Sequence, residues 1–156
     1  MNNPEKPGLR YAVQVTKINE NIALARRDDH ELQVSIKKGD NSQGFNAVET
    51  LLAALGTCVL TNINDFSKKL RLKINTAKVK LVAVRSNDPP KVESIQYQLI
   101  IQSDEDRNKL EELFHLSQKW GTVTNTLIET VDISGTLVIN VLEAEIDENS
   151  DLNDAF

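Results

Sequence analysis

The sequence predicts an α+β protein with mostly antiparallel sheets around two long central helices. Leu32, Val34 and Ile36 alternate with polar residues, which is the pattern of a half-buried strand. Between Val48 and Asn64 the only charged side chain is Glu49, which is typical of a core helix. Along the chain, three strands precede the first helix, two more precede the second, and a last strand follows, an order typical of this fold class.

The first part of the chain reads as strands after a flexible arm. Residues 1–10 contain prolines and a glycine and no apolar stretch. N-terminal strands are expected over residues 11–37, because apolar and polar side chains alternate there. Residues 38–44 have the composition of a loop.

A core helix is expected over residues 47–68. Its uncharged stretch is shorter than the ~20 apolar residues of a bilayer span, so no membrane association is expected. Ala53, Ala54 and Gly56 are small enough for a second helix to approach closely. Because one small chain cannot cover so apolar a helix on all sides, we expect a homodimer with a shared core.

The second part repeats the order of strands followed by a helix. A strand pair is expected over residues 77–102, with a turn at Asn87-Asp-Pro-Pro90. A helix is predicted over residues 104–119, capped by Ser103 and ended by Gly121. A closing strand over 129–141 completes the fold.

Composition limits the domain organisation and the partners. The chain has 156 residues, which fits a single domain over residues 11–142, followed by an acidic tail over 143–156 that we expect to be disordered. Its net charge of −5 argues against a nucleic-acid partner. The absence of an apolar leader in the first ten residues favours a cytoplasmic location.

The titratable residues indicate neither a metal nor another cofactor. His30 lies in a charged turn, His115 on the exposed side of the second predicted helix, and Cys58 is the only cysteine. Two separated histidines and one cysteine do not make a zinc site. A single cysteine also excludes an intramolecular disulfide.

Cys58 and Glu49 are the candidate catalytic residues of the core helix. Free cysteines are among the most buried residues, so Cys58 is either a small core side chain or a protected reactive thiol. Glu49 is either an anion favoured by the helix dipole or a catalytic acid. The sequence pattern leaves both alternatives open.

Three segments resemble the OsmC/Ohr family. They are Asn46-Ala-Val-Glu-Thr-Leu-Leu-Ala-Ala-Leu-Gly-Thr-Cys58, Gly121-Thr-Val-Thr-Asn-Thr-Leu127 and Val131-Asp-Ile-Ser-Gly135. The resemblance implies an OsmC-like fold in an intertwined homodimer with active sites at the subunit interface. It also implies thiol-dependent reduction of hydroperoxides, organic ones in particular, as part of oxidative-stress defence.

The cysteine pattern of the family is only half present. Cys58 matches the reactive cysteine, whereas Gly121 and Thr122 stand where the family has its resolving cysteine and a proline. Trp120, the only tryptophan, adjoins this position. It either fills the space of the missing cysteine or lines an apolar pocket together with Gly121.

The arginine and glutamate of the family pattern are also replaced. Val48 stands at the position of the glutamate, with Glu49 beside it, and Asn21 aligns with the arginine. Arg26 and Arg27 are the remaining candidates for the cation that activates the thiol and binds the peroxide.

Two functions of different classes follow. The first is a one-cysteine thiol peroxidase that forms a sulfenic acid at Cys58 and is regenerated by an external thiol reductant. The second is a non-catalytic dimeric binding protein that keeps the fold and an interface pocket for a small hydroperoxide or an apolar ligand.

Overall fold

The computed structural model describes residues 8–39 and 42–140. These residues form two compact units, one ending at Thr50 and the other beginning at Leu51. Each unit is described by itself. The acidic tail expected over 143–156, and all of the arm expected over 1–10 except residues 8–10, lie outside the described residues. The single domain over 11–142 stays a prediction.

The first unit contains a three-stranded antiparallel sheet in the order β1-β2-β3. Its strands are β1 (Gln14–Lys17), β2 (Ile22–Arg27) and β3 (His30–Ser35). They lie within the predicted range of 11–37. His30 begins β3 opposite Arg27, so it belongs to a strand and not to the turn expected from its charged neighbours.

One face of this sheet has exposed apolar side chains at its centre. Val15, Ala25 and Leu32 are opposite one another on adjacent strands and therefore share a face. The side chains of Val15 and Leu32 are 62% and 47% exposed. Val13 is 65% exposed and precedes β1 by one residue.

Helix α1 (Ala47–Lys69) begins and ends within one residue of the predicted range. Its first turn is fixed by a reciprocal pair of hydrogen bonds. Asn46 Oδ1 accepts from the backbone N–H groups of Val48 (2.9 Å) and Glu49 (3.0 Å), and Glu49 Oε2 accepts from the Asn46 N–H (2.9 Å). This is a capping box, and it satisfies N–H groups that have no partner within the helix.

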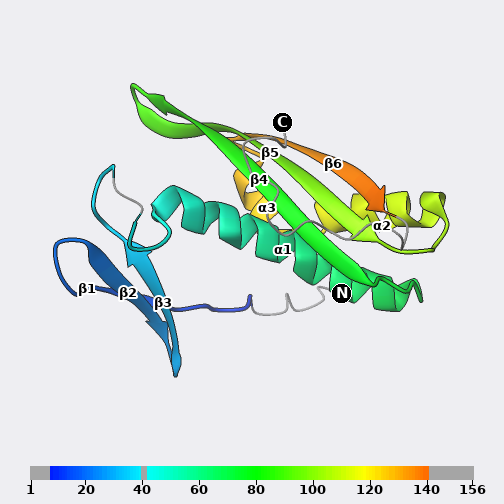
Figure 1. The fold of residues 1–156 in the computed structure, drawn as a ribbon, viewed down its shortest axis with the longest axis horizontal. Helices are drawn as coiled ribbons and strands as arrows, with labels where there is room; N and C mark the ends of the chain where they lie inside the picture. The colour runs from blue at the N-terminus through cyan, green and yellow to red at the C-terminus, as the bar shows by residue number, and fades with distance from the viewer. Residues whose placement is uncertain (1–7, 40–41, 141–156) are drawn as a thin grey trace, which may run out of the picture. The chain divides into compact units, whose positions relative to one another are not determined.

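The second unit is built on a three-stranded sheet in the order β4-β5-β6. β4 (Thr76–Asn87) and β5 (Pro90–Gln102) form the antiparallel pair expected over 77–102. β6 (Asp132–Asn140) pairs with β5 in parallel. Figure 1 shows the crossover between them, which passes through the two helices that follow β5.

These helices are α2 (Arg107–Lys119) and α3 (Thr122–Leu127). The prediction that Ser103 caps a helix starting at residue 104 is wrong: Asp106 is the N-cap and accepts from Asn108 N. Ser103 follows β5; its Oγ donates to the Lys73 carbonyl oxygen at 2.7 Å and accepts from the Glu105 N–H at 3.2 Å. Helix α3 was not predicted from the sequence.

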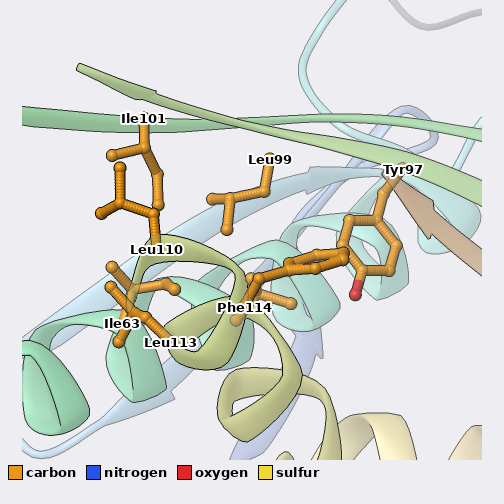
Figure 2. Close-up of a cluster of buried hydrophobic side chains, with 8 residues drawn as sticks. Ile63, Tyr97, Leu99, Ile101, Leu110, Leu113 and Phe114 are labelled. Carbon is orange, nitrogen blue, oxygen red and sulfur yellow. The ribbon is translucent and has the colours of Figure 1, made fainter. Parts of the chain in front are cut away.

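The main core lies where α1 and α2 pack against β5 (Figure 2). The strand contributes Tyr97, Leu99 and Ile101, which alternate toward the helices. By length and composition alone α1 is apolar enough to cross a membrane. Its Leu55 and Val59 are fully buried in the two apolar clusters of the second unit.

Candidate active site

Cys58 lies in the middle of α1 and is half-buried. Its neighbour Val59 is fully buried, whereas Thr57 and Thr61 are exposed. The thiol therefore lies at the border between the core face and the outer face of the helix. Its position makes it neither a fully enclosed core side chain nor a freely exposed one.

The outer face of α1 beside Cys58 is uncharged. Ala54, Thr57 and Thr61 are exposed, and Thr61 Oγ1 donates to the Thr57 carbonyl oxygen at 2.8 Å. Gly56 does not belong to this face. A Cβ at Gly56 would lie 3.0 Å from Leu81 Cδ1 of β4, so the glycine serves packing within the chain and not the approach of a second helix.

The segment that resembles the second family motif links α2 to α3. Gly121 is the N-cap of α3, and a Cβ on it would lie 2.6 Å from Thr124 Oγ1 and 3.3 Å from the Ser117 carbonyl oxygen. The space that a resolving cysteine would need is therefore filled by Thr124. Trp120 does not fill it, because its side chain is 58% exposed and lies 5.7 Å from the Lys119 ammonium.

A hydrogen bond connects this segment to the cysteine helix. Asn62 Nδ2 donates to the Ser117 carbonyl oxygen at 3.0 Å. Asn62 lies one helical turn after Cys58, and Ser117 is within one turn of Gly121. This contact was not predicted, although an asparagine in an otherwise apolar helix is a signal for a buried hydrogen bond.

Of the other predicted site residues, Glu49 forms the capping box of α1, which supports its interpretation as a helix-start anion. Arg26 and Arg27 lie on β2 in the first unit. Arg26 is paired with Glu31 on the adjacent strand, and Arg27 Nε is 3.5 Å from Asp28 Oδ2. All four of these side chains are at least half exposed.

In the described part of the chain, no three histidine, cysteine, aspartate or glutamate side chains come together as a metal site.

The family model of the OsmC-like proteins matches residues 38–135. This range contains Cys58 and Gly121 and leaves out β1, β2 and β3. No curated protein matches the chain.

Several solved structures share the fold. An OsmC-like protein from Mycoplasma pneumoniae has a TM-score of 0.75 at 20% identity, covering 83% of this chain and 98% of that one. A hypothetical protein from Aquifex aeolicus has a TM-score of 0.76 at 20% identity, covering 87% and 100%. The organic hydroperoxide resistance protein OhrB of Bacillus subtilis has a TM-score of 0.60 at 17% identity, covering 83% and 98%.

Proposed function

The chain belongs to the OsmC-like protein family, and we propose that it reduces organic hydroperoxides with Cys58 as its single redox thiol. The observation that carries the proposal is the half-buried Cys58 on α1, at the position that matches the reactive cysteine of the family. A half-buried thiol can meet a small substrate and still be shielded from bulk oxidants. The organic hydroperoxide resistance proteins among the similar structures support the same substrate class.

The proposed reaction begins with the Cys58 thiolate, because the thiolate is the nucleophilic form of cysteine. Its sulfur attacks the terminal oxygen of ROOH, and the O–O bond breaks. The sulfur is oxidised to a sulfenic acid, and the leaving alkoxide takes up a proton to become ROH.

Regeneration requires a reductant from outside the chain. Cys58 is the only cysteine, and the resolving position holds Gly121, which packs against Thr124. A small thiol therefore condenses with the sulfenic acid, forming a mixed disulfide and water. A second thiol attacks this disulfide, releases a small-molecule disulfide and restores Cys58.

Arg26 is the proposed cation of the site. A guanidinium that assists a peroxide needs a carboxylate to hold its orientation, and Glu31 provides one for Arg26. Arg27 has only the carboxylate of the next residue, Asp28, beside it. The variants Arg26→Met and Arg27→Met form a matched pair. Only Arg26→Met is expected to lose peroxidase activity.

The proposed assembly is a homodimer. The uncharged outer face of α1 and the apolar sheet face with Val15 and Leu32 are both exposed in the single chain. Exposed apolar surfaces of this kind are typical of subunit interfaces. Sedimentation velocity is expected to give a dimer at micromolar concentration, and a stable folded monomer there would contradict the proposal. A cytoplasmic location, where small thiols are abundant, fits the need for an external reductant.

The test is hydroperoxide consumption by the purified protein. Cumene hydroperoxide with a dithiol reductant is expected to be consumed by the wild type and not by Cys58→Ser. Mass spectrometry after peroxide treatment, with dimedone as the trap, is expected to show a sulfenic acid on Cys58. A wild type that forms no dimedone adduct and turns over no faster than Cys58→Ser would contradict the peroxidase proposal.

The alternative function is a non-catalytic binding protein. This alternative is supported by Thr124, whose side chain takes up the space that a resolving cysteine at position 121 would need. On this alternative Cys58 is inert toward peroxide, and iodoacetamide labels it only in the unfolded protein. Rapid labelling of the folded dimer would contradict the binding-protein alternative.

A further inference from the structure

A cavity of about 360 Å³ lies in the second unit between α2, α3, β5 and β6. Two residues of its lining, Tyr97 and Thr124, carry buried hydroxyl groups, and neither Tyr97 Oη nor Thr124 Oγ1 has a partner in ordinary hydrogen-bond geometry among the described residues. The two residues are only 1% and 5% exposed. Buried hydroxyls are normally paired, so two orphans at one cavity indicate that something absent from the chain satisfies them.

The packing of two glycines holds both hydroxyl-bearing side chains in place. A Cβ on Gly135 of β6 would lie 2.6 Å from Tyr97 Oη, and a Cβ on Gly121 would lie 2.6 Å from Thr124 Oγ1. Figure 2 shows the Tyr97 oxygen pointing from β5 into the helical layer. The two orphan groups are therefore fixed by the backbone and are not mobile surface side chains.

The lining of the cavity favours an anion with an apolar part. Lys119 and His115 of α2 line it, and no aspartate or glutamate does. Ile128 and Ile133 provide apolar surface, and Ile128 is 56% exposed. Donors, a cation and aliphatic side chains therefore meet at one site.

We propose that this cavity binds a small organic carboxylate with a short aliphatic chain. The carboxylate oxygens accept hydrogen bonds from Tyr97 Oη and Thr124 Oγ1, while Ile128 and Ile133 contact the aliphatic chain. A carboxylate fits two orphan hydroxyl donors because it only accepts hydrogen bonds when ionised. Lys119 offsets its charge. This inference stands independently of the chemistry proposed for Cys58.

The protonation of Tyr97 agrees with the donor role. Burial raises the pKa of Tyr97 above its usual value, and the neighbouring Gln118 side chain lowers it by a smaller amount. The hydroxyl therefore keeps its proton at neutral pH and can donate it. Gln118 and Lys119 also line the cavity. In the proposed complex these two side chains move aside, since rotamer changes of exposed side chains are fast compared with binding.

The test is a titration of the ¹⁵N-labelled full chain with sodium butyrate, followed by amide resonances and compared with sodium chloride at equal ionic strength. Butyrate is expected to shift the resonances of Thr124 and Asn125 saturably, and 1-butanol is not. Thr124→Val and Tyr97→Phe each remove one hydroxyl at nearly constant shape. Each is expected to weaken butyrate binding by about 10-fold or more, as for the loss of one hydrogen bond to a charged group.

Thr126→Val is the matched control. Thr126 lies on the same helix, is exposed, and its hydroxyl donates to the Thr122 carbonyl oxygen at 2.8 Å outside the cavity lining. Its butyrate affinity is expected to stay within about 2-fold of the wild type, because it removes no bond to the ligand. Lys119→Gln is expected to weaken butyrate binding without unfolding the protein.

Three results would overturn the proposal. The first is a set of resonance shifts that sodium chloride reproduces. The second is equal butyrate affinity in the wild type, Tyr97→Phe and Thr124→Val, with thermal unfolding showing that all three are folded. The third is a crystal structure grown with butyrate in which only water bridges the two hydroxyls.

Discussion

Gly135 should be the glycine of the second unit that least tolerates a side chain. A Cβ at this position of β6 would lie 2.3 Å from Cζ of Tyr97 and 2.6 Å from its Cε1. Real Cβ atoms essentially never approach other atoms within 3.0 Å. To reach ordinary van der Waals contact, the ring or the strand must retreat by about 1 Å.

On the side of Phe114 the ring has little room to retreat. Tyr97 is 1% exposed and packs edge-on against Phe114, with the ring centroids 6.3 Å apart, and Phe114 is itself 8% exposed. Overpacking of this kind costs typically ~1–3 kcal/mol. The loss of glycine's chain entropy in the unfolded state returns about 0.5–1 kcal/mol. We therefore expect Gly135→Ala to lower the free energy of unfolding by about 1–2 kcal/mol.

Gly56→Ala is the matched control. Its Cβ would meet only Leu81 Cδ1, at 3.0 Å, and this is the far end of a flexible side chain. An alanine within a helix is favoured over glycine by about 1 kcal/mol, so this variant is expected to be as stable as the wild type or slightly more stable.

The assay is equilibrium unfolding in urea, followed by far-ultraviolet circular dichroism, on the wild type, both glycine variants, Tyr97→Leu and the double variant Gly135→Ala/Tyr97→Leu. If the clash is with the ring, the double variant loses less stability than the sum of the single variants, by about 1 kcal/mol or more. Equal midpoints for the two glycine variants, or strictly additive losses, would refute the reasoning.

Three further predictions concern the cap, the buried tyrosine and the missing cysteine. Asn46→Ala removes the N-cap of α1 and should lower the free energy of unfolding in urea by ~0.5–2 kcal/mol, whereas no loss would mean that the capping box is not formed in solution. Because burial raises the pKa of Tyr97, the unfolded chain releases this proton first, so stability should be unaffected below about pH 10 and fall above it. Thermal unfolding of Tyr97→Phe should show a smaller alkaline loss, and identical alkaline slopes would contradict the assignment. Gly121→Cys forces Thr124 Oγ1 aside and should destabilise the chain by ~1–3 kcal/mol, with recovery when Thr124→Ala makes room; an unchanged melting temperature in Gly121→Cys alone would contradict it.

The features set by local pattern could be predicted from the sequence. The alternation around Leu32 and Val34 and the uncharged run after Glu49 located strands and a helix within a few residues of where they lie. The Leu110, Leu113 and Phe114 stripe of α2 is buried as its spacing indicates. These patterns depend on near neighbours in the chain, and the periods of helix and strand translate them directly into a buried face.

Features set by partners distant in sequence escaped prediction. The start of α2 moved from residue 104 to Arg107 because Ser103 bonds to Lys73, which is 30 residues away. The parallel pairing of β6 with β5 depends on the crossover through α2 and α3, and no local pattern encodes it. The six residues of α3, among them three threonines, have weak helix propensity and gave no periodic signal.

The candidate site shows the same division. The helix motif ending at Cys58 could be read directly, and the structure adds that the thiol is half-buried. The sequence could show that Gly121 lacks a thiol, but only the structure shows that Thr124 takes up the space. Thr124 also carries one of the two buried hydroxyls at the cavity between α2, α3, β5 and β6. The residue that packs against Gly121, where the chain departs from the two-cysteine pattern, therefore also lines the proposed carboxylate site. Substitutions of Thr124 therefore test both inferences. If Thr124→Ala restores the stability of Gly121→Cys, Thr124 occupies the space that a resolving cysteine would need. If Thr124→Val weakens butyrate binding, its hydroxyl belongs to the carboxylate site.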